Sequence, residues 1–237
     1  MQVASKSLLW GGSLPKDVTV LILRTKPGAM SAMLCVGDLA PGSVGVTVDW
    51  GDGTREEYED LNGRTHTYTK AGDFKVKISD DISSLGYTEA SPAQAHYRDM
   101  LIELVQLGSK VKKIAEYGFN NCHNMRGVMN LPNVDYIESY AFGTTLGITD
   151  YILPSMRTLE ADSFYFGSSP TRMYIDNATY VSGSFWEYYG PNLTDMFIRG
   201  KTCEEIKAMG EFPFMAGAGV RFHGSDGIVL GSGEILH

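Results

Sequence analysis

A repeated spacing of phenylalanines in the second half of the chain constrains the fold more than any other feature of the sequence. Phe119, Phe142 and Phe164 follow one another at intervals of 23 and 22 residues. Aliphatic residues precede the rings at a fixed distance, and further apolar residues precede those: Ile114, Ile137, Leu159, Val111, Val134 and Met156. A unit this short cannot bury its own apolar face, so the units are expected to stack into a solenoid with one continuous core.

The sequence of these units resembles the BspA-like leucine-rich repeats over roughly residues 100–198. The clearest copies are "GFNNCHNM" and "YIESYAF", and Leu-Pro pairs at 131–132 and 153–154 open the second and third units. A weaker fourth unit runs through Val181, Trp186, Leu193 and Ile198. The resemblance implies a role in adhesion and protein interaction, and not in catalysis.

The first half of the chain has the pattern of short β-strands separated by turns. In "VTVDWGDGTREEY" and the two residues before it, the apolar residues Val44, Val46, Val48 and Trp50 occupy every second position, which is the period of a half-buried strand. Asp52-Gly53 is a dipeptide that favours a tight turn. A later strand places Phe74, Val76 and Ile78 on one face. Several short strands at this spacing predict a β-sandwich.

The stretch "VDWGDGT…HTYTKAGDFKVKI" resembles the polycystic-kidney-disease (PKD) domain over roughly residues 14–85. The matching positions are Trp50, Gly51, Asp52, Gly53, His66, Tyr68, Gly72, Phe74 and Val76. The resemblance implies an immunoglobulin-like sandwich that serves as a non-catalytic spacer or adhesion unit in extracellular and viral proteins.

Five carboxylates near the tight turn raise the question of a calcium site: Asp49, Asp52, Glu56, Glu57 and Asp60. Hard oxygen ligands bind calcium, but these residues lack the regular spacing of a calcium loop. The favoured interpretation is a hairpin turn with a solvated acidic face, so no metal and no cofactor is expected. His66 next to these carboxylates also allows acid–base chemistry, but the PKD pattern accounts for it as a structural residue.

The junction between the halves has two possible structures. Residues 91–108, "SPAQAHYRDMLIELVQLG", have the caps and spacing of one helix. The BspA resemblance instead implies a short helical turn around residues 92–98, followed by a strand at 101–108 that caps the solenoid. The second structure is preferred.

The C-terminal segment combines a short helix with a hairpin. Thr202 and Glu205 form a capping box, Gly210 ends the helix, and residues 224–227 form a turn between two β-rich arms. His223 and Asp226 flank that turn and allow a site there, although turn chemistry also explains Asp226. The order of these elements resembles a C-terminal element of tail-associated proteins of gut bacteriophages.

These patterns predict a mainly β protein with three parts. An immunoglobulin-like sandwich with an N-terminal arm spans residues 1–88, a short leucine-rich-repeat solenoid spans 89–200, and a cap of helix and hairpin spans 201–237. The first two parts are expected to have separate cores joined near residues 85–100, so that residues 1–88 fold alone.

Composition excludes several classes of function. The net charge of −8 argues against a nucleic-acid binder, which usually carries a basic patch. Cys35, Cys122 and Cys203 have neither disulfide nor zinc spacing, so three buried thiols are expected. No apolar run approaches the ~20 residues of a membrane helix. The N-terminal stretch is a poor signal peptide, so ordinary secretion is not expected of a chain that begins there.

The leading functional hypothesis is a non-enzymatic bacteriophage virion protein, tail- or capsid-associated, that attaches to a host surface or to other virion proteins. The alternative is a bacterial cell-surface BspA-like adhesin, located outside the cell. An accessory role in a carbohydrate-active enzyme is a third hypothesis, but no carboxylate pair has the placement that glycoside hydrolysis needs. Rigid aromatic side chains are typical of binding hot spots, and the candidates are Tyr180, Trp186, Tyr188 and Tyr189.

Overall fold

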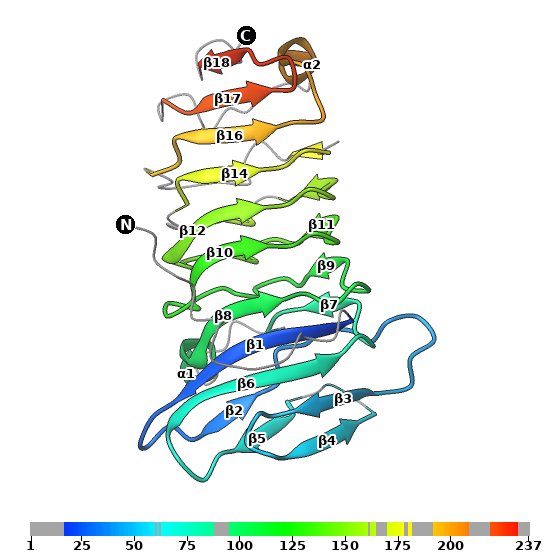
Figure 1. Ribbon diagram of the computed structural model, residues 1–237, viewed down its shortest axis with the longest axis vertical. Helices are drawn as coiled ribbons and strands as arrows, with labels where there is room; N and C mark the ends of the chain where they lie inside the picture. Colours follow the sequence, from blue (N-terminus) through cyan, green and yellow to red (C-terminus); the bar gives the residue numbers. More distant parts are fainter. Residues whose placement is uncertain are drawn as a thin grey trace.

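The strands of the protein stack one above another into a tall column in the computed structural model (Figure 1). The model describes residues 17–59, 61, 63–87, 95–160, 162–164, 170–177, 180–181, 192–208 and 219–231. Strands outnumber helices throughout this described part, which confirms a mainly β fold with a solenoid region.

Two antiparallel sheets form the base of the column. The larger sheet consists of β1 (Val18–Thr25), β3 (Val46–Asp49), β4 (Arg55–Tyr58), β6 (Gly72–Ser79) and β8 (Leu101–Gln106). Its strands lie in the order β4-β3-β6-β1-β8. The smaller sheet pairs β2 (Ser31–Met33) with β5 (Thr65–Thr67). We call this region the base; the predicted immunoglobulin-like sandwich and PKD relationship stay predictions.

Aromatic packing holds the base together. Trp50 is fully buried, and the Tyr68 ring stacks on Phe74 with 3.9 Å between ring centroids. Val46 and Val48 are buried as the alternation predicts. Val44, however, is 89% exposed. It precedes Gly45 and the first paired residue of β3, so it lies outside the strand whose alternation included it.

Two parallel sheets run along the solenoid. The first, which we call the long sheet, contains β10 (Arg126–Asn130), β12 (Gly147–Ile152), β14 (Arg172–Tyr174), β16 (Asp195–Ile198) and β17 (Arg221–Gly224), and ends in the antiparallel β18 (Val229–Gly231). The second, the narrow sheet, contains β7 (Ser84–Leu85), β9 (Lys113–Ile114), β11 (Tyr136–Ile137), β13 (Thr158–Leu159) and β15 (Tyr180–Val181). Four successive coils contribute one strand to each sheet, in the pairs β9 and β10, β11 and β12, β13 and β14, and β15 and β16.

The phenylalanines stack inside the coils in the predicted register. The ring centroids of Phe119 and Phe142 are 5.4 Å apart, and those of Phe142 and Phe164 are 5.2 Å apart, with nearly parallel planes. All three rings are fully buried. Ile114 pairs with Ile137 across the narrow sheet. One coil of the solenoid therefore consists of 22–23 residues, the spacing of the phenylalanines in the sequence, which confirms the solenoid.

The junction joins the two regions more closely than the sequence suggests. Helix α1 (Ala95–Met100) ends where β8 begins, so the single long helix is wrong. β8 pairs with β1 of the base. This pairing contains two register irregularities. The buried apolar residues form one cluster from Leu21 to Leu230, so the expectation of separate cores is wrong.

The far end of the column carries the remaining helix and hairpin, as predicted (Figure 1). Helix α2 (Cys203–Ala208) begins with the capping box: the Thr202 backbone N–H donates to Glu205 at 2.7 Å, and the Glu205 N–H donates to the Thr202 hydroxyl at 3.3 Å. β17 and β18 form the antiparallel hairpin. Gly210 lies outside the described residues.

Candidate binding surface

The outer face of the long sheet presents two rows of side chains that run along the column. Alternate residues of a strand point to opposite faces, and the inward ones are buried: Met129, Tyr151, Met173, Met196 and Phe222. Strand register aligns the outward residues across the coils. One set, the charged row, is Val128, Asp150, Arg172, Asp195 and Arg221. The other set, the ring row, is Asn130, Ile152, Tyr174, Phe197 and His223.

The charged row alternates in sign, but its anions and cations differ in exposure. Arg172 Nε donates to Asp150 Oδ1 at 2.5 Å, and Arg221 Nη2 donates to Asp195 Oδ2 at 2.7 Å. The two carboxylates are only 8% and 12% exposed, whereas the two guanidinium side chains are 52% and 61% exposed. The row therefore presents positive charge outward on a protein whose net charge is −8.

Asp195 is held by three donors at the centre of this face. It accepts hydrogen bonds from Arg221, from His223 Nε2 at 2.6 Å and from the Thr194 hydroxyl at 2.8 Å. Partial burial raises the pKa of the Asp195 carboxyl, but these hydrogen bonds and the Arg221 charge outweigh burial and lower that pKa to about 2. The carboxylate is thus fixed in its charged form.

The three upper residues of the ring row, Tyr174, Phe197 and His223, form a stack of flat side chains. Tyr174 and Phe197 lie 4.6 Å apart with an interplanar angle of 11°, and Phe197 and His223 lie 4.3 Å apart at 15°. The Arg199 guanidinium lies 5.2 Å from the Tyr174 ring centre and also bonds Asp176 at 2.6 Å and 2.8 Å. Because the rings cover one another's faces, the stack offers its edges to a partner. It does not form an open platform for a sugar.

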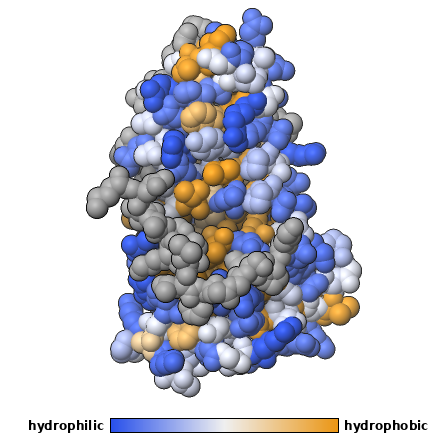
Figure 2. Space-filling view, in the orientation of Figure 1, coloured by the Kyte–Doolittle hydropathy of each residue, from blue (hydrophilic) through white to orange (hydrophobic). Residues whose placement is uncertain are grey.

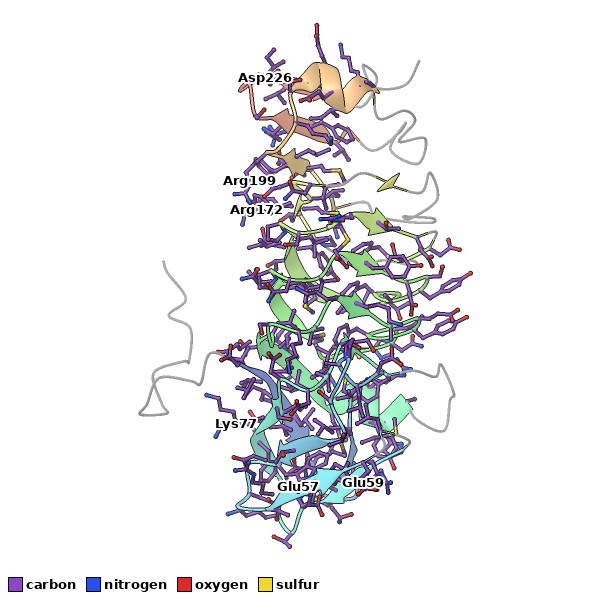
Figure 3. The ribbon with its side chains drawn as sticks, turned by 90° about the vertical axis from the view of Figure 1, so that its right-hand side faces the viewer. Glu57, Glu59, Lys77, Arg172, Arg199 and Asp226 are labelled. Atoms are coloured by element: carbon purple, nitrogen blue, oxygen red, sulfur yellow. The ribbon has the colours of Figure 1, made fainter. Side chains whose placement is uncertain are left out.

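Apolar side chains occupy the lower end of this face. Val128 and Leu146 are about half exposed, and Val105 of β8 is more than a third exposed. Figure 2 shows hydrophobic residues gathered on the middle of this face, at the level of β10 and β12, among hydrophilic ones. Figure 3 shows Arg172 and Arg199 one above the other on the same side of the column. The face therefore combines an apolar lower part with a cationic upper part.

Of the four aromatic residues predicted from the sequence as a binding site, only Tyr180 lies in the described part of the chain. Tyr180 belongs to β15 of the narrow sheet, which pairs with β13. Trp186, Tyr188 and Tyr189 lie outside the described residues, so their role stays a prediction. The rows of the long sheet were missed, although Asp150, Arg172 and Asp195 recur at the same 22–23-residue spacing as the phenylalanines.

Three of the carboxylates near the tight turn, Asp49, Asp52 and Glu56, have protein partners, whereas Asp60 lies outside the described residues. Asp49 Oδ1 accepts from the Gly51 N–H at 3.0 Å, and Asp52 accepts from the Thr54 N–H at 2.9 Å and bonds His66 Nε2 at 2.8 Å. His66 in turn stacks on the Trp50 ring, 4.9 Å away. These contacts make the turn a closed hairpin with a structural histidine.

Glu56 completes the turn by bonding aromatic side chains. It accepts from Trp50 Nε1 at 2.7 Å and from the Tyr58 hydroxyl at 2.5 Å. Burial and the Glu56 hydrogen bond raise the pKa of Tyr58 to about 12. Within the described ranges, no group of three or more His, Cys, Asp or Glu side chains is arranged to hold a metal ion.

The other candidates from the sequence serve the structure. His223 bonds Asp195, whereas Asp226 accepts from the backbone N–H groups of Cys203 at 2.9 Å and Ile228 at 3.2 Å, so the two residues do not form a joint site. The three cysteines are free and buried, as expected. Burial raises the pKa of the Cys35 thiol to about 12 and that of Cys122 well above its usual value, which disfavours a reactive thiolate.

No helix in the described part of the chain is long and apolar enough to cross a membrane.

Comparison with known proteins supports the repeat assignment. No curated protein and no solved structure matches the chain. Residues 92–209, just under half of the chain, match the family model described as BspA type Leucine rich repeat region (6 copies). The solenoid of this protein is therefore similar to BspA-type leucine-rich repeat regions.

Proposed function

We propose that this protein is a non-enzymatic adhesin that acts at a cell surface and holds a partner protein through the outer face of the long sheet. The match of residues 92–209 to the BspA-type repeats is the observation that carries this proposal. A stack of parallel strands keeps the outward rows at fixed spacing, so the face is organised before a partner arrives. Rigid surfaces lose little conformational entropy on binding.

The chemistry of the face fits a protein partner with an acidic rim. Interface cores are enriched in aromatic residues and Arg, and the upper part of this face presents Arg172, Arg221 and the edges of the ring row. The exposed apolar residues below them supply area that a partner buries. Exposed guanidinium groups attract an acidic surface and speed the encounter.

The absence of catalysis is part of the proposal. Two carboxylates that bond histidines also have structural partners: Asp195 bonds Arg221, and Asp52 caps the turn at Thr54. The same binding activity in a virion is the alternative location. The comparisons give that location no support, so we place the adhesin first.

Attachment of labelled protein to cultured epithelial cells and to intact bacteria tests the proposal. We expect saturable attachment that trypsin treatment of the target cells abolishes, because trypsin removes surface proteins. Arg172→Gln combined with Arg221→Gln should weaken attachment at least about tenfold, since each change removes an outward charge and keeps a hydrogen-bond donor.

A matched variant controls for the loss of charge. Arg24 pairs with Asp73 in the base and is as exposed as Arg172, and Arg55 is an exposed residue of β4. Arg24→Gln with Arg55→Gln should attach like the unmodified protein. Equal attachment by both double variants would remove the long sheet from the proposal, and hydrolysis of a glycan by the purified protein would refute the non-enzymatic role.

A further inference from the structure

A polar groove lies at the corner where each coil turns from the long sheet to the narrow sheet. Its volume is about 560 Å³. Six residues line it: Lys112, Asn133, Asp135, Ser155, Arg157 and Asn177. The lining includes two cations, one anion, two amides and a hydroxyl, and no aromatic or aliphatic side chain. The groove is separate from the outer face of the long sheet.

The repeat builds this groove from equivalent positions of three coils. Asn133, Ser155 and Asn177 follow β10, β12 and β14, whereas Lys112, Asp135 and Arg157 precede β9, β11 and β13. The Asp135 N–H donates to the Lys112 carbonyl at 2.9 Å, and the Arg157 N–H donates to the Asp135 carbonyl at 2.9 Å. Stacked strands lie about 5 Å apart, so Lys112 and Arg157 are roughly 10 Å apart along the column.

Part of the lining is fixed and part is available to a ligand. The Ser155 hydroxyl donates to the Pro132 carbonyl at 2.6 Å, and the Asn177 amide donates to the Pro154 carbonyl, so these two side chains tie adjacent coils together. By contrast, the side chains of Lys112, Asn133 and Asp135 form no hydrogen bond or ion pair with another described residue. These three side chains therefore offer donors and acceptors to a ligand, whereas Arg157 also has an interaction within the protein.

We propose that this groove binds an acidic polysaccharide that carries a carboxylate on every second sugar. Lys112 and Arg157 would each bind one carboxylate. The two residues lie two coils apart, with the coil of Asp135 between them. In such a polymer the acid groups are likewise two sugars apart, with one neutral sugar between them. Asn133 would bond the hydroxyls of the sugar between them, since an amide both donates and accepts. A protein partner fits this groove less well, because it offers no apolar pocket for a hot-spot side chain.

Asp135 sets the selectivity of the site. Asp135 belongs to the coil between those of Lys112 and Arg157, so its carboxylate would oppose the middle sugar and would repel a polymer that carries a charge on every sugar. The overall charge of −8 acts in the same direction and weakens non-specific binding of polyanions. Selectivity for alternating charge therefore follows from the order Lys, Asp, Arg along the column.

Titration of the whole protein with hyaluronan oligosaccharides tests this inference, because these carry a carboxylate on every second sugar. Calorimetry should detect binding that weakens as salt is raised. Neutral chitin oligosaccharides should not bind, and polygalacturonate oligosaccharides, charged on every sugar, should bind more weakly. Lys112→Ala with Arg157→Ala should lower affinity at least about tenfold, and Asp135→Asn should raise affinity for polygalacturonate.

Matched variants separate this site from a general charge effect and from the proposed adhesion. Lys70→Ala with Arg55→Ala removes the same charge from exposed positions in the base and should leave hyaluronan binding unchanged. Arg172→Gln with Arg221→Gln should also leave it unchanged, so failure of the groove and failure of the adhesive face are distinguishable. Melting curves check that every variant is folded.

Three results would overturn the inference. The first is no heat of binding up to about 1 mM hyaluronan oligosaccharide. The second is a Lys112 and Arg157 double variant that binds hyaluronan as tightly as the unmodified protein. The third is a neutral oligosaccharide that binds as tightly as hyaluronan. Loss of hyaluronan binding in Asp135→Asn would also contradict it, because the carboxylate would then hold the ligand instead of selecting against extra charge.

Discussion

Asp195 joins two neighbouring coils through one carboxylate. It belongs to β16, and two of its partners, Arg221 and His223, belong to β17. The hairpin strand β17 is thus attached to the solenoid by charge as well as by backbone pairing. Because the lowered pKa of Asp195 reflects these contacts, its titration reports on how firmly the hairpin is held.

The stability that Asp195 contributes should depend on pH in a defined range. A carboxyl group whose pKa is lowered in the folded protein stabilises it above the unfolded pKa, near 4, and loses that contribution as pH falls through the folded value of about 2. Asp195→Asn should therefore be less stable at pH 6, by on the order of 1 kcal/mol. Urea unfolding at pH 6 and near pH 2 should show this difference shrink, and a constant difference would contradict the assignment.

The tight turn of the base should be indifferent to calcium. Asp49, Asp52 and Glu56 each bond a protein donor, so a calcium ion would have to displace contacts that already close the turn. A ligand that binds only the folded protein raises its melting temperature. We expect the same melting temperature with millimolar calcium and with a chelator. A rise of several degrees with calcium would show that the carboxylates rearrange into a metal site.

At the scale of elements, the stacked phenylalanines carry the solenoid. Phe142 lies between two other rings and contacts the buried Tyr151 edge to face at 5.0 Å. Phe142→Ala removes the middle of this stack and should lower the free energy of unfolding by about 3–5 kcal/mol. Val128→Ala, at a half-exposed position on the long sheet, should cost less than about 0.5 kcal/mol. Equal effects in chemical denaturation would mean that the repeat register is wrong.

Periodic and local features of the fold could be predicted from the sequence. The spacing of Phe119, Phe142 and Phe164 predicted the coils, and Thr202 with Glu205 predicted the start of α2, because each signal depends only on nearby residues or on a fixed period. The pairing of β8 with β1 could not be predicted in this way, since it joins residues about 80 positions apart and contains register irregularities.

The candidate surface was predicted less well for a related reason. The many aromatic residues of 180–189 predicted a binding surface there. The described face depends instead on which residues of successive strands point outward together. Tyr174, Phe197 and His223 are separated by 23 and then 26 residues, so the longer last coil hides their alignment. Only the strand register shows that they form one row.

At the scale of the whole molecule, the base and the solenoid support each other. Arg98 of α1 is almost completely buried and donates to the carbonyls of Tyr117 at 2.7 Å and Asn120 at 2.8 Å, both in the first turns of the solenoid. Its guanidinium also lies 5.1 Å from the ring centre of Tyr87, which follows β7. β7, which precedes residue 88 in the chain, pairs with β9 in the narrow sheet. The column therefore has no clean boundary at residue 88.

A fragment of residues 1–88 should consequently fail to fold cooperatively. It lacks β8, which covers one edge of β1, and the buried side chains of Met100, Leu101 and Leu104. Each such side chain contributes about 2 kcal/mol by burial, and their sum is comparable to the 5–15 kcal/mol stability of a typical domain. A fragment of residues 1–146 keeps β8, α1 and the first coils and serves as the control. Circular dichroism during urea unfolding should show a cooperative transition for the longer fragment alone, and a sharp transition of residues 1–88 near the midpoint of the full chain would establish an independent domain.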